Sequence, residues 1–300
     1  MLIINITIME KLGYIFFRIL IFIFGLIPFW LLYILSDLLF FMFFYVVKYR
    51  KDVVFTNLRN SFPEKTQDEI SKIAKSFYHN LSDITVESIK GLTMSKSELL
   101  KRYKVLNPEL EKKIFENGKG VIALGSHYAN WEWGVLSFSL QFSHQPYGLY
   151  KPLSNKYTDN YIRKSRAAWG MNLVPINETY QHFKKEFKKP PMHIMVSDQS
   201  PSNLKKAYWI RFLNQDTPCL HGAESYAKQT NMPVIYGNVQ RLKRGYYEVT
   251  LIHVISKPLE RDDGEITKMF HEILEEIIIK KPEDWLWSHK RWKHSLSKPI

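Results

Sequence analysis

Cysteine is almost absent from this 300-residue sequence, in which Cys219 is the only one. A single cysteine excludes an intramolecular disulfide framework and a cysteine-based metal site. The chain also lacks the Gly-x-Ser-x-Gly of serine hydrolases, the P-loop, and a Gly-x-Gly-x-x-Gly after a strand. No His-Glu-x-x-His spacing is present. We therefore propose no zinc site and expect no cofactor.

Acidic residues are also fewer than basic residues. The chain has 29 Asp and Glu against 42 Lys and Arg, a formal net charge of +13. Such a balance implies an acidic partner, which can be nucleic acid, anionic lipid or an acidic protein. Charge alone leaves all three open. The hydrophobic fraction of 45% argues against disorder and fits a globular or membrane-associated protein.

The most apolar region covers residues 12–47, in which Arg18 and Asp37 are the clear charges. A membrane span needs about 20 apolar residues, and residues 19–36 nearly supply them. Gly25 and Pro28 would break or kink a helix there. One kinked span and a shallow re-entrant hairpin are both compatible with this pattern.

The same region fits a cleavable signal peptide less well, because it is too long and no small-residue cleavage site follows. Lys48, Arg50 and Lys51 come directly after it. By the positive-inside tendency, these charges predict that the rest of the chain is cytoplasmic. We expect a membrane anchor with a basic flank over residues 1–52 and a single domain over residues 53–300.

Strand and helix patterns alternate regularly in the second half of the chain, after amphipathic helical segments between residues 53 and 104. This alternation predicts an α/β domain with a mainly parallel sheet flanked by helices. The predicted strands are 121–124, 147–150, 173–175, 193–197, 207–213, 234–239 and 247–254, and the predicted helices are 130–142, 155–169, 178–188, 222–230 and 264–280.

The most informative stretch is residues 120–132. His127 follows the first predicted strand, and Glu132 lies in the first turn of a helix that Asn130 can cap. A carboxylate bound to one imidazole nitrogen leaves the other nitrogen free as a base for a hydroxyl proton. The alternative is a surface histidine and a glutamate that only favours the helix dipole. We expect Glu132 to orient His127.

Three other features allow more than one interpretation. Ser126 could be interpreted as a nucleophile beside His127, but the side chains of adjacent residues rarely face one another in a productive geometry. Asp198 ends a predicted strand and either positions a substrate or forms a turn ahead of Pro201. Aromatic and basic residues alternate over residues 285–293, which suits an anionic membrane interface, single-stranded nucleic acid or packing on the core. We favour the membrane interface.

These features come together in a family resemblance. Residues 127–132 (His-Tyr-Ala-Asn-Trp-Glu) resemble the His-x4-Glu/Asp motif of glycerolipid and lipid A acyltransferases. Four further blocks resemble the lipid A late acyltransferases in order and spacing. They are residues 150–153 (Tyr-Lys-Pro-Leu), Arg163 and Arg166 ahead of Gly170, residues 198–201 (Asp-Gln-Ser-Pro), and residues 282–293, which carry Trp287, His289 and Arg291.

The resemblance implies a glycerolipid acyltransferase-like fold and transfer of a fatty acyl group from a thioester. The donor would be acyl carrier protein or acyl-CoA, and the acceptor a hydroxyl of a lipid A precursor at the inner membrane. His127 would be the general base. Substrate contacts would come from Lys151, Arg163, Arg166, Asp198 and Gln199.

Residues 214–224 depart from the family pattern, which is usually rich in Thr, Ser and Gly at this point. Cys219, His221 and Glu224 are unusual there, and they leave the acyl pocket and the acceptor open. A lysophospholipid or aminolipid acceptor is therefore an alternative. A membrane-tethered binding protein without catalysis is a second alternative. A nucleic-acid-binding role is a distant third, and we expect no nucleic acid partner.

Overall fold

The computed structural model describes the backbone of residues 2–294 and the side chains of residues 9–294. Its centre is a seven-stranded sheet with the order β1-β9-β8-β2-β5-β3-β4. Every neighbouring pair is parallel except β8 and β9, which form an antiparallel hairpin. The seven strands are Tyr103–Val105 (β1), Val121–Gly125 (β2), Gln145–Tyr150 (β3), Asn172–Pro175 (β4), Pro191–Val196 (β5), Val234–Lys243 (β8) and Tyr246–Ile255 (β9).

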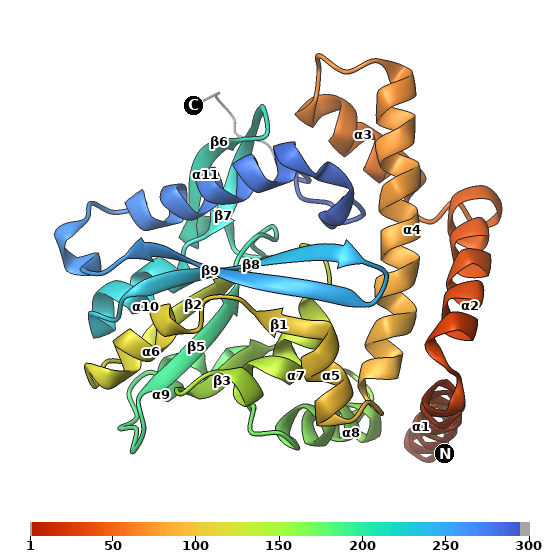
Figure 1. Ribbon diagram of the computed structural model, residues 1–300, viewed down its shortest axis with the longest axis horizontal. Helices are drawn as coiled ribbons and strands as arrows, with labels where there is room; N and C mark the ends of the chain where they lie inside the picture. Colours follow the sequence, from red (N-terminus) through yellow and green to blue (C-terminus); the bar gives the residue numbers. More distant parts are fainter. Residues whose placement is uncertain (1, 295–300) are drawn as a thin grey trace.

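Helices cover the sheet and continue past its edge (Figure 1). Helix α11 lies on one side of the sheet, and α7 and α8 lie on the other (Figure 1). The predicted α/β class is therefore confirmed. The helices are Leu2–Leu26 (α1), Phe29–Phe41 (α2), Lys51–Ser61 (α3), Gln67–Gly91 (α4), Lys96–Arg102 (α5), Glu109–Glu116 (α6), Trp131–Gln141 (α7), Lys156–Ala167 (α8), Thr179–His182 (α9), Gly222–Thr230 (α10) and Glu265–Lys280 (α11).

The central strand β2 is buried over Val121–Leu124, as expected for a strand covered on both faces. It lies between β5 and β8. Because β2 and β5 are parallel neighbours, the residues that follow them emerge at the same edge of the sheet. This edge carries the candidate site.

Several predicted elements differ from the structure. The predicted strand 207–213 is β6 (Ala207–Phe212), but it pairs with the unpredicted β7 (Gln215–Leu220) in a separate two-stranded sheet. Strand β1 was also unpredicted. The predicted helix 178–188 is wrong beyond α9, because a run of lysines and then Pro190 follow the first helical turn.

The N-terminal region forms two helices that separate at Pro28, followed by a π-helical turn over Met42–Val46. Within the described residues, Phe29–Val46 is the segment long and apolar enough to cross a membrane, with a mean hydropathy of 2.0. Only 17% of it is buried, unlike a core helix. It is a candidate membrane anchor, as the sequence predicted.

Helix α4 joins this region to the domain. A capping box of Thr66 and Glu69 starts it. Near its end Glu87 is fully buried, and its carboxylate accepts hydrogen bonds from Tyr33 on α2 (2.9 Å), Asn130 (2.8 Å) and Tyr247 on β9 (2.6 Å). One carboxylate thus links the apolar helices to the segment that precedes α7.

Candidate active site

His127 lies at the carboxyl end of β2, two residues beyond Gly125. The neighbouring strand β5 ends one residue before Ser197, whose N–H donates to the carbonyl of Gly125 at 3.1 Å. This bond continues the sheet by one residue. It brings Asp198 next to His127, although the two are 71 positions apart in sequence.

Asp198 is the direct partner of His127. Its Oδ1 lies 2.7 Å from the ring Nδ1, and its Oδ2 accepts the His127 backbone N–H at 2.9 Å. Trp285 donates its indole N–H to the same Oδ2 at 2.9 Å. Burial alone would raise the pKa of Asp198, but the His127 ring and these donors lower it to about 2. Asp198 is therefore a buried, ionised carboxylate.

The second ring nitrogen of His127, Nε2, faces the side chain of Gln199. Because Asp198 accepts at Nδ1, the neutral ring carries its proton there, and Nε2 is an acceptor. The Gln199 amide lies 3.1 Å from Nε2. Burial lowers the pKa of His127, but the charges of Asp198 and Glu132 outweigh it, and the pKa is raised overall. This is the arrangement of a base with a fixed tautomer.

The expected contact between Glu132 and His127 is replaced by another. Glu132 lies in the first turn of α7, and Asn130 caps that helix as predicted, accepting from the N–H of Trp133 at 3.0 Å. The Glu132 carboxylate accepts from Arg166 at 2.6 Å. Asp198, not Glu132, holds the ring Nδ1, because β5 brings Asp198 directly alongside.

The three predicted basic residues differ in position. Arg166 is half-buried on α8 and reaches Glu132. Arg163 lies on the exposed surface of α8, and Lys151 is exposed just after β3. Of the three, the structure brings Arg166 into the His127 site.

The C-terminal segment forms the wall of the site. Tyr128 forms an antiparallel bridge with Trp285, and the N–H of Leu286 donates to the carbonyl of His127 at 3.1 Å. His289 Nε2 accepts from the backbone N–H of Ser200 at 3.2 Å. Sequence analysis missed Trp285 and His289 as site residues. The available signal was the C-terminal block of residues 282–293, in which His289 is the motif histidine and Trp285 holds the hydrophobic position.

The predicted membrane interface at residues 285–293 is wrong for its central side chains. Trp285 is 3% exposed, Trp287 is fully buried and Arg291 is 1% exposed. Arg291 donates to the carbonyl of Pro218 and lies 3.3 Å from Cys219 Sγ. Trp285, Trp287 and Arg291 are packed against the domain, where they support the loop that carries His127, whereas Lys290 and Lys293 are exposed.

A sequence model described as bacterial lipid A biosynthesis acyltransferase matches residues 5–294. The chain belongs to this family. It is 22% identical over 252 residues to a lipid A biosynthesis lauroyltransferase of Escherichia coli K12, covering 82% of this chain and 80% of that one. A lipid A biosynthesis palmitoleoyltransferase of Escherichia coli K12 is 22% identical over 256 residues, with the same shares of 82% and 80%. The family membership supports acyl transfer to lipid A.

This lipid A acyltransferase family member has an apolar cavity beside the site. The cavity lies between α7 and the sheet, and it extends from Ser126 and Trp131 to residues remote from His127 in sequence. Its lining is almost entirely apolar. Phe138 and Phe142 of the α7 segment, Gly237 of β8 and Leu251 of β9 are among the lining residues.

Potential nucleophiles near the site are held in other contacts. The Ser126 hydroxyl lies 2.8 Å from that of Tyr236 in a buried pair. Burial raises the pKa of the Cys219 thiol to about 11, despite the nearby Arg291. At neutral pH this thiol is protonated, and a protonated buried thiol is a poor nucleophile.

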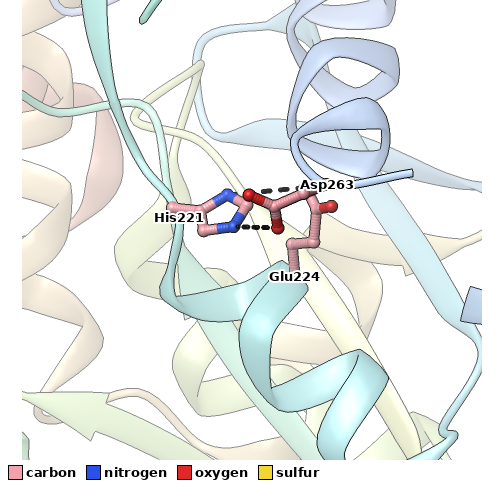
Figure 2. A group of neighbouring side chains, drawn as sticks. All are labelled: His221, Glu224 and Asp263. Carbon is pink, nitrogen blue, oxygen red and sulfur yellow. Dashed lines mark hydrogen bonds and ion pairs between the residues drawn. The ribbon is translucent and has the colours of Figure 1, made fainter. Parts of the chain in front are cut away.

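One other cluster has the composition of a metal site. His221, Glu224 and Asp263 lie together at the start of α10 and α11 (Figure 2). Lys228 already places its ammonium 3.0 Å from Glu224. The two Glu224 oxygens also accept from Gly264 N, Thr267 N and Thr267 Oγ1. These donors use the lone pairs that a metal ion would need, so we interpret the cluster as a clasp between α10 and α11.

Proposed function

We propose that this protein transfers a fatty acyl group from an acyl thioester to a hydroxyl of a lipid A precursor. The carrier is acyl carrier protein or CoA. The reaction takes place at the inner membrane, with the domain on the cytoplasmic side. The observation that carries the proposal is the His127–Asp198 pair, which adjoins an apolar cavity through the cavity-lining residues Ser126 and Trp131.

His127 is the general base in this proposal. The acceptor hydroxyl displaces the Gln199 amide from Nε2, and this nitrogen then removes the hydroxyl proton. The acceptor oxygen then forms a bond to the thioester carbonyl carbon. When the tetrahedral intermediate collapses, the carbon–sulfur bond breaks, and the departing thiolate takes the proton from His127. Asp198 stabilises the imidazolium between these steps.

The ion pair of Glu132 and Arg166 contributes to the same proposed reaction. The Arg166 guanidinium is available to the developing oxyanion or to an acceptor phosphate, and Glu132 sets its position. Arg163 and Lys151 add positive charge for an anionic acceptor. Gln199 positions the acceptor hydroxyl at His127.

Direct transfer is supported over a covalent acyl-enzyme. An acyl-enzyme needs an activated Ser or Cys, whereas Ser126 is paired with Tyr236 and Cys219 is buried and protonated. The apolar cavity offers a place for the acyl chain during transfer. The apolar helices α1 and α2 attach the protein to the membrane that holds the acceptor.

The decisive experiment is a reconstituted transfer assay. The full-length protein is incubated with acyl carrier protein or CoA thioesters and with a lipid A precursor, a lysophospholipid or an aminolipid, and products are read by mass spectrometry. We expect one added acyl chain on the lipid A precursor, and none with the His127→Ala variant. Product on another acceptor alone would reject the lipid A assignment. Wild-type turnover by His127→Ala would reject the mechanism.

A further inference from the structure

The two N-terminal helices each present an apolar stripe to the outside. The exposed residues recur at three- and four-residue spacing, so they lie on one face of each helix. On α1 they are Leu12, Ile15, Phe16, Ile19, Phe22, Ile23 and Leu26, and on α2 they are Trp30, Ile34, Leu38 and Phe41.

The opposite face of α1 is held by the domain. Arg18 on α1 lies over the ring of Tyr161 on α8, and Asn155 donates to the carbonyl of Glu10 at 2.9 Å. At the other end of the helix, Lys90 donates to the carbonyls of residues 24, 25 and 27 at 2.7–3.0 Å. Helix α1 therefore lies along the domain, not away from it.

Helix α2 is held along its length by α4, and the two run antiparallel and side by side (Figure 1). As the chain advances along α2, its partners on α4 move backwards by one turn at a time. The contacts are Tyr33 with Glu87, Ser36 with Asp83, and Phe40 with His79. If α2 spanned the bilayer, α4 would therefore lie beside it at the same levels.

This packing is incompatible with a span. The middle of Phe29–Val46 is near Asp37, which pairs with Arg244 of the β8–β9 turn. If α2 crossed the bilayer, Arg244 and Asp83 would lie near its centre, where charged side chains are strongly unfavourable. The polar face of α4 would lie there too.

We infer that α1 and α2 lie in the plane of the membrane surface, with their outward stripes immersed and neither helix crossing the bilayer. Amphipathic helices of this kind bury one face about 5–10 Å deep. The exposed side chains around the stripes fit an anionic lipid surface. They include the basic Lys11, Lys48 and Lys243 and the interfacial aromatic Tyr45, and Trp30 adds an interfacial aromatic within the stripe of α2.

The turn of the β8–β9 hairpin provides a second contact with the same surface. Arg244 ties this turn to Asp37 of α2. Leu242 is 59% exposed at its tip, beside exposed Lys243. An apolar tip with a basic neighbour, fixed next to an apolar stripe, is placed to enter the headgroup region. This inference rests on the proposed membrane attachment and is independent of the acyl-transfer chemistry.

The first test compares two isoleucines of equal exposure. Ile34 on α2 and Ile279 on α11 are both 55% exposed. The Ile34→Glu and Ile279→Glu variants of the full chain are floated with vesicles that contain phosphatidylglycerol. We expect Ile34→Glu to lower the vesicle-bound fraction about tenfold or more, and Ile279→Glu to bind like wild type. Equal binding by both variants would overturn the inference. A wild-type dimer in detergent that the Ile34→Glu substitution dissociates would also overturn it, because the stripe would then be a protein interface.

The second test measures topology in membrane vesicles of both orientations. Protease-cleavable epitopes are placed at the N-terminus and at the C-terminus of the full chain. We expect the protease to remove both from the same side. A Pro28→Cys variant then separates in-plane helices from a two-span hairpin, with the buried Cys219 of the unmodified chain as background. Labelling of Pro28→Cys by an impermeant maleimide from the side opposite the C-terminus would show a crossing and reject the inference.

The results separate the two proposals. A protein that floats with vesicles and has both ends on one side, yet transfers no acyl chain, contradicts only the proposed function. A protein that transfers acyl chains and shows its ends on opposite sides contradicts only the in-plane arrangement.

Discussion

Asp198 accepts hydrogen bonds from both the ring and the main chain of His127, so one carboxylate fixes the position and the tautomer of this histidine. Trp285 donates a third bond to it from the C-terminal segment. Three parts of the chain thus meet at one buried charge.

Asp198→Asn should reduce kcat strongly while the protein remains folded. An amide that turns its N–H₂ toward Nδ1 favours the wrong tautomer and no longer stabilises the imidazolium, and we expect a loss of roughly 10²–10⁴-fold. Steady-state kinetics give the rate, and circular dichroism checks the fold. Asp198→Asn with wild-type kcat would remove Asp198 from the mechanism.

Activity should increase with pH through the pKa of His127, because the neutral ring is the base in the proposed mechanism. The pKa is raised above its ordinary 6.5 by the charges of Asp198 and Glu132, in spite of burial. We therefore expect the rising limb of kcat/KM to be centred above pH 6.5 in the wild type. Glu132→Gln removes one of these charges and should move the limb to lower pH. A limb that does not move would show that Glu132 has no electrostatic effect on the base.

The Asp198 carboxylate should also stabilise the fold in a pH-dependent way. Its pKa is about 2 in the folded protein, against an ordinary value of 3.8. A lowered pKa contributes stability that is present above the ordinary value and is lost as the pH falls toward 2. The difference in unfolding free energy between wild type and Asp198→Asn should therefore narrow from pH 5 to pH 2. Denaturant titrations at several pH values measure it, and a constant difference would contradict the lowered pKa.

Glu132 and Arg166 should behave as a coupled pair. Each is less than one-third exposed, and their charged groups are 2.6 Å apart. Removing either leaves the other without its partner, so the loss in kcat/KM for Glu132→Gln with Arg166→Ala should be smaller than the product of the single losses. The coupling expected for contacting residues is about 0.5–3 kcal/mol. Arg163→Ala is the matched control, because Arg163 lies on the exposed face of the same helix. The effects of Arg163→Ala and Glu132→Gln on kcat/KM should therefore be independent, so that the double variant shows the product of the two single losses.

Two substitutions in the apolar cavity should shift acyl-chain preference in opposite directions. A methyl group at Gly237 would meet Val249 at 3.8 Å and Phe138 at 3.9 Å, which are ordinary contacts, so Gly237→Ala fills space without a clash. It should favour shorter chains, whereas Phe142→Ala enlarges the cavity and should favour longer ones. Each methylene of chain length is worth about 0.8 kcal/mol, or roughly fourfold in preference. Competition between thioesters of different length measures the shift. The same direction of shift in both variants would show that the chain does not bind there.

The sequence alone predicts the sheet and the edge that carries the site. His127 and Asp198 each follow an apolar strand, and parallel strands end at a common edge. The sequence does not predict which carboxylate contacts the His127 ring. Glu132 is five residues away and Asp198 is 71, and the choice depends on β2 and β5 being neighbours. Strand order arises from packing across the whole domain, not from local pattern.

The C-terminal segment shows a second limit of composition. Trp and Arg side chains suit a membrane surface and a buried polar cluster equally well. Whether the Trp and Arg side chains are buried depends on their contacts with residues elsewhere in the chain. Asn57 on α3 donates to the carbonyls of Trp287 and His289, and no local pattern in the segment itself reveals that contact.

The buried Glu87 has a practical consequence for handling this protein. Its carboxylate is shared by Tyr33 of the apolar helices and by Asn130, which caps the active-site helix. Cutting the chain after residue 52, to obtain a soluble enzyme, would remove Tyr33 and Ser36. Their partners Glu87 and Asp83, which are buried in the full chain, would then face water. The apolar segment is therefore part of the catalytic unit. With the proposed membrane attachment, detergents that strip lipid from α2 would act on the scaffold of His127 itself.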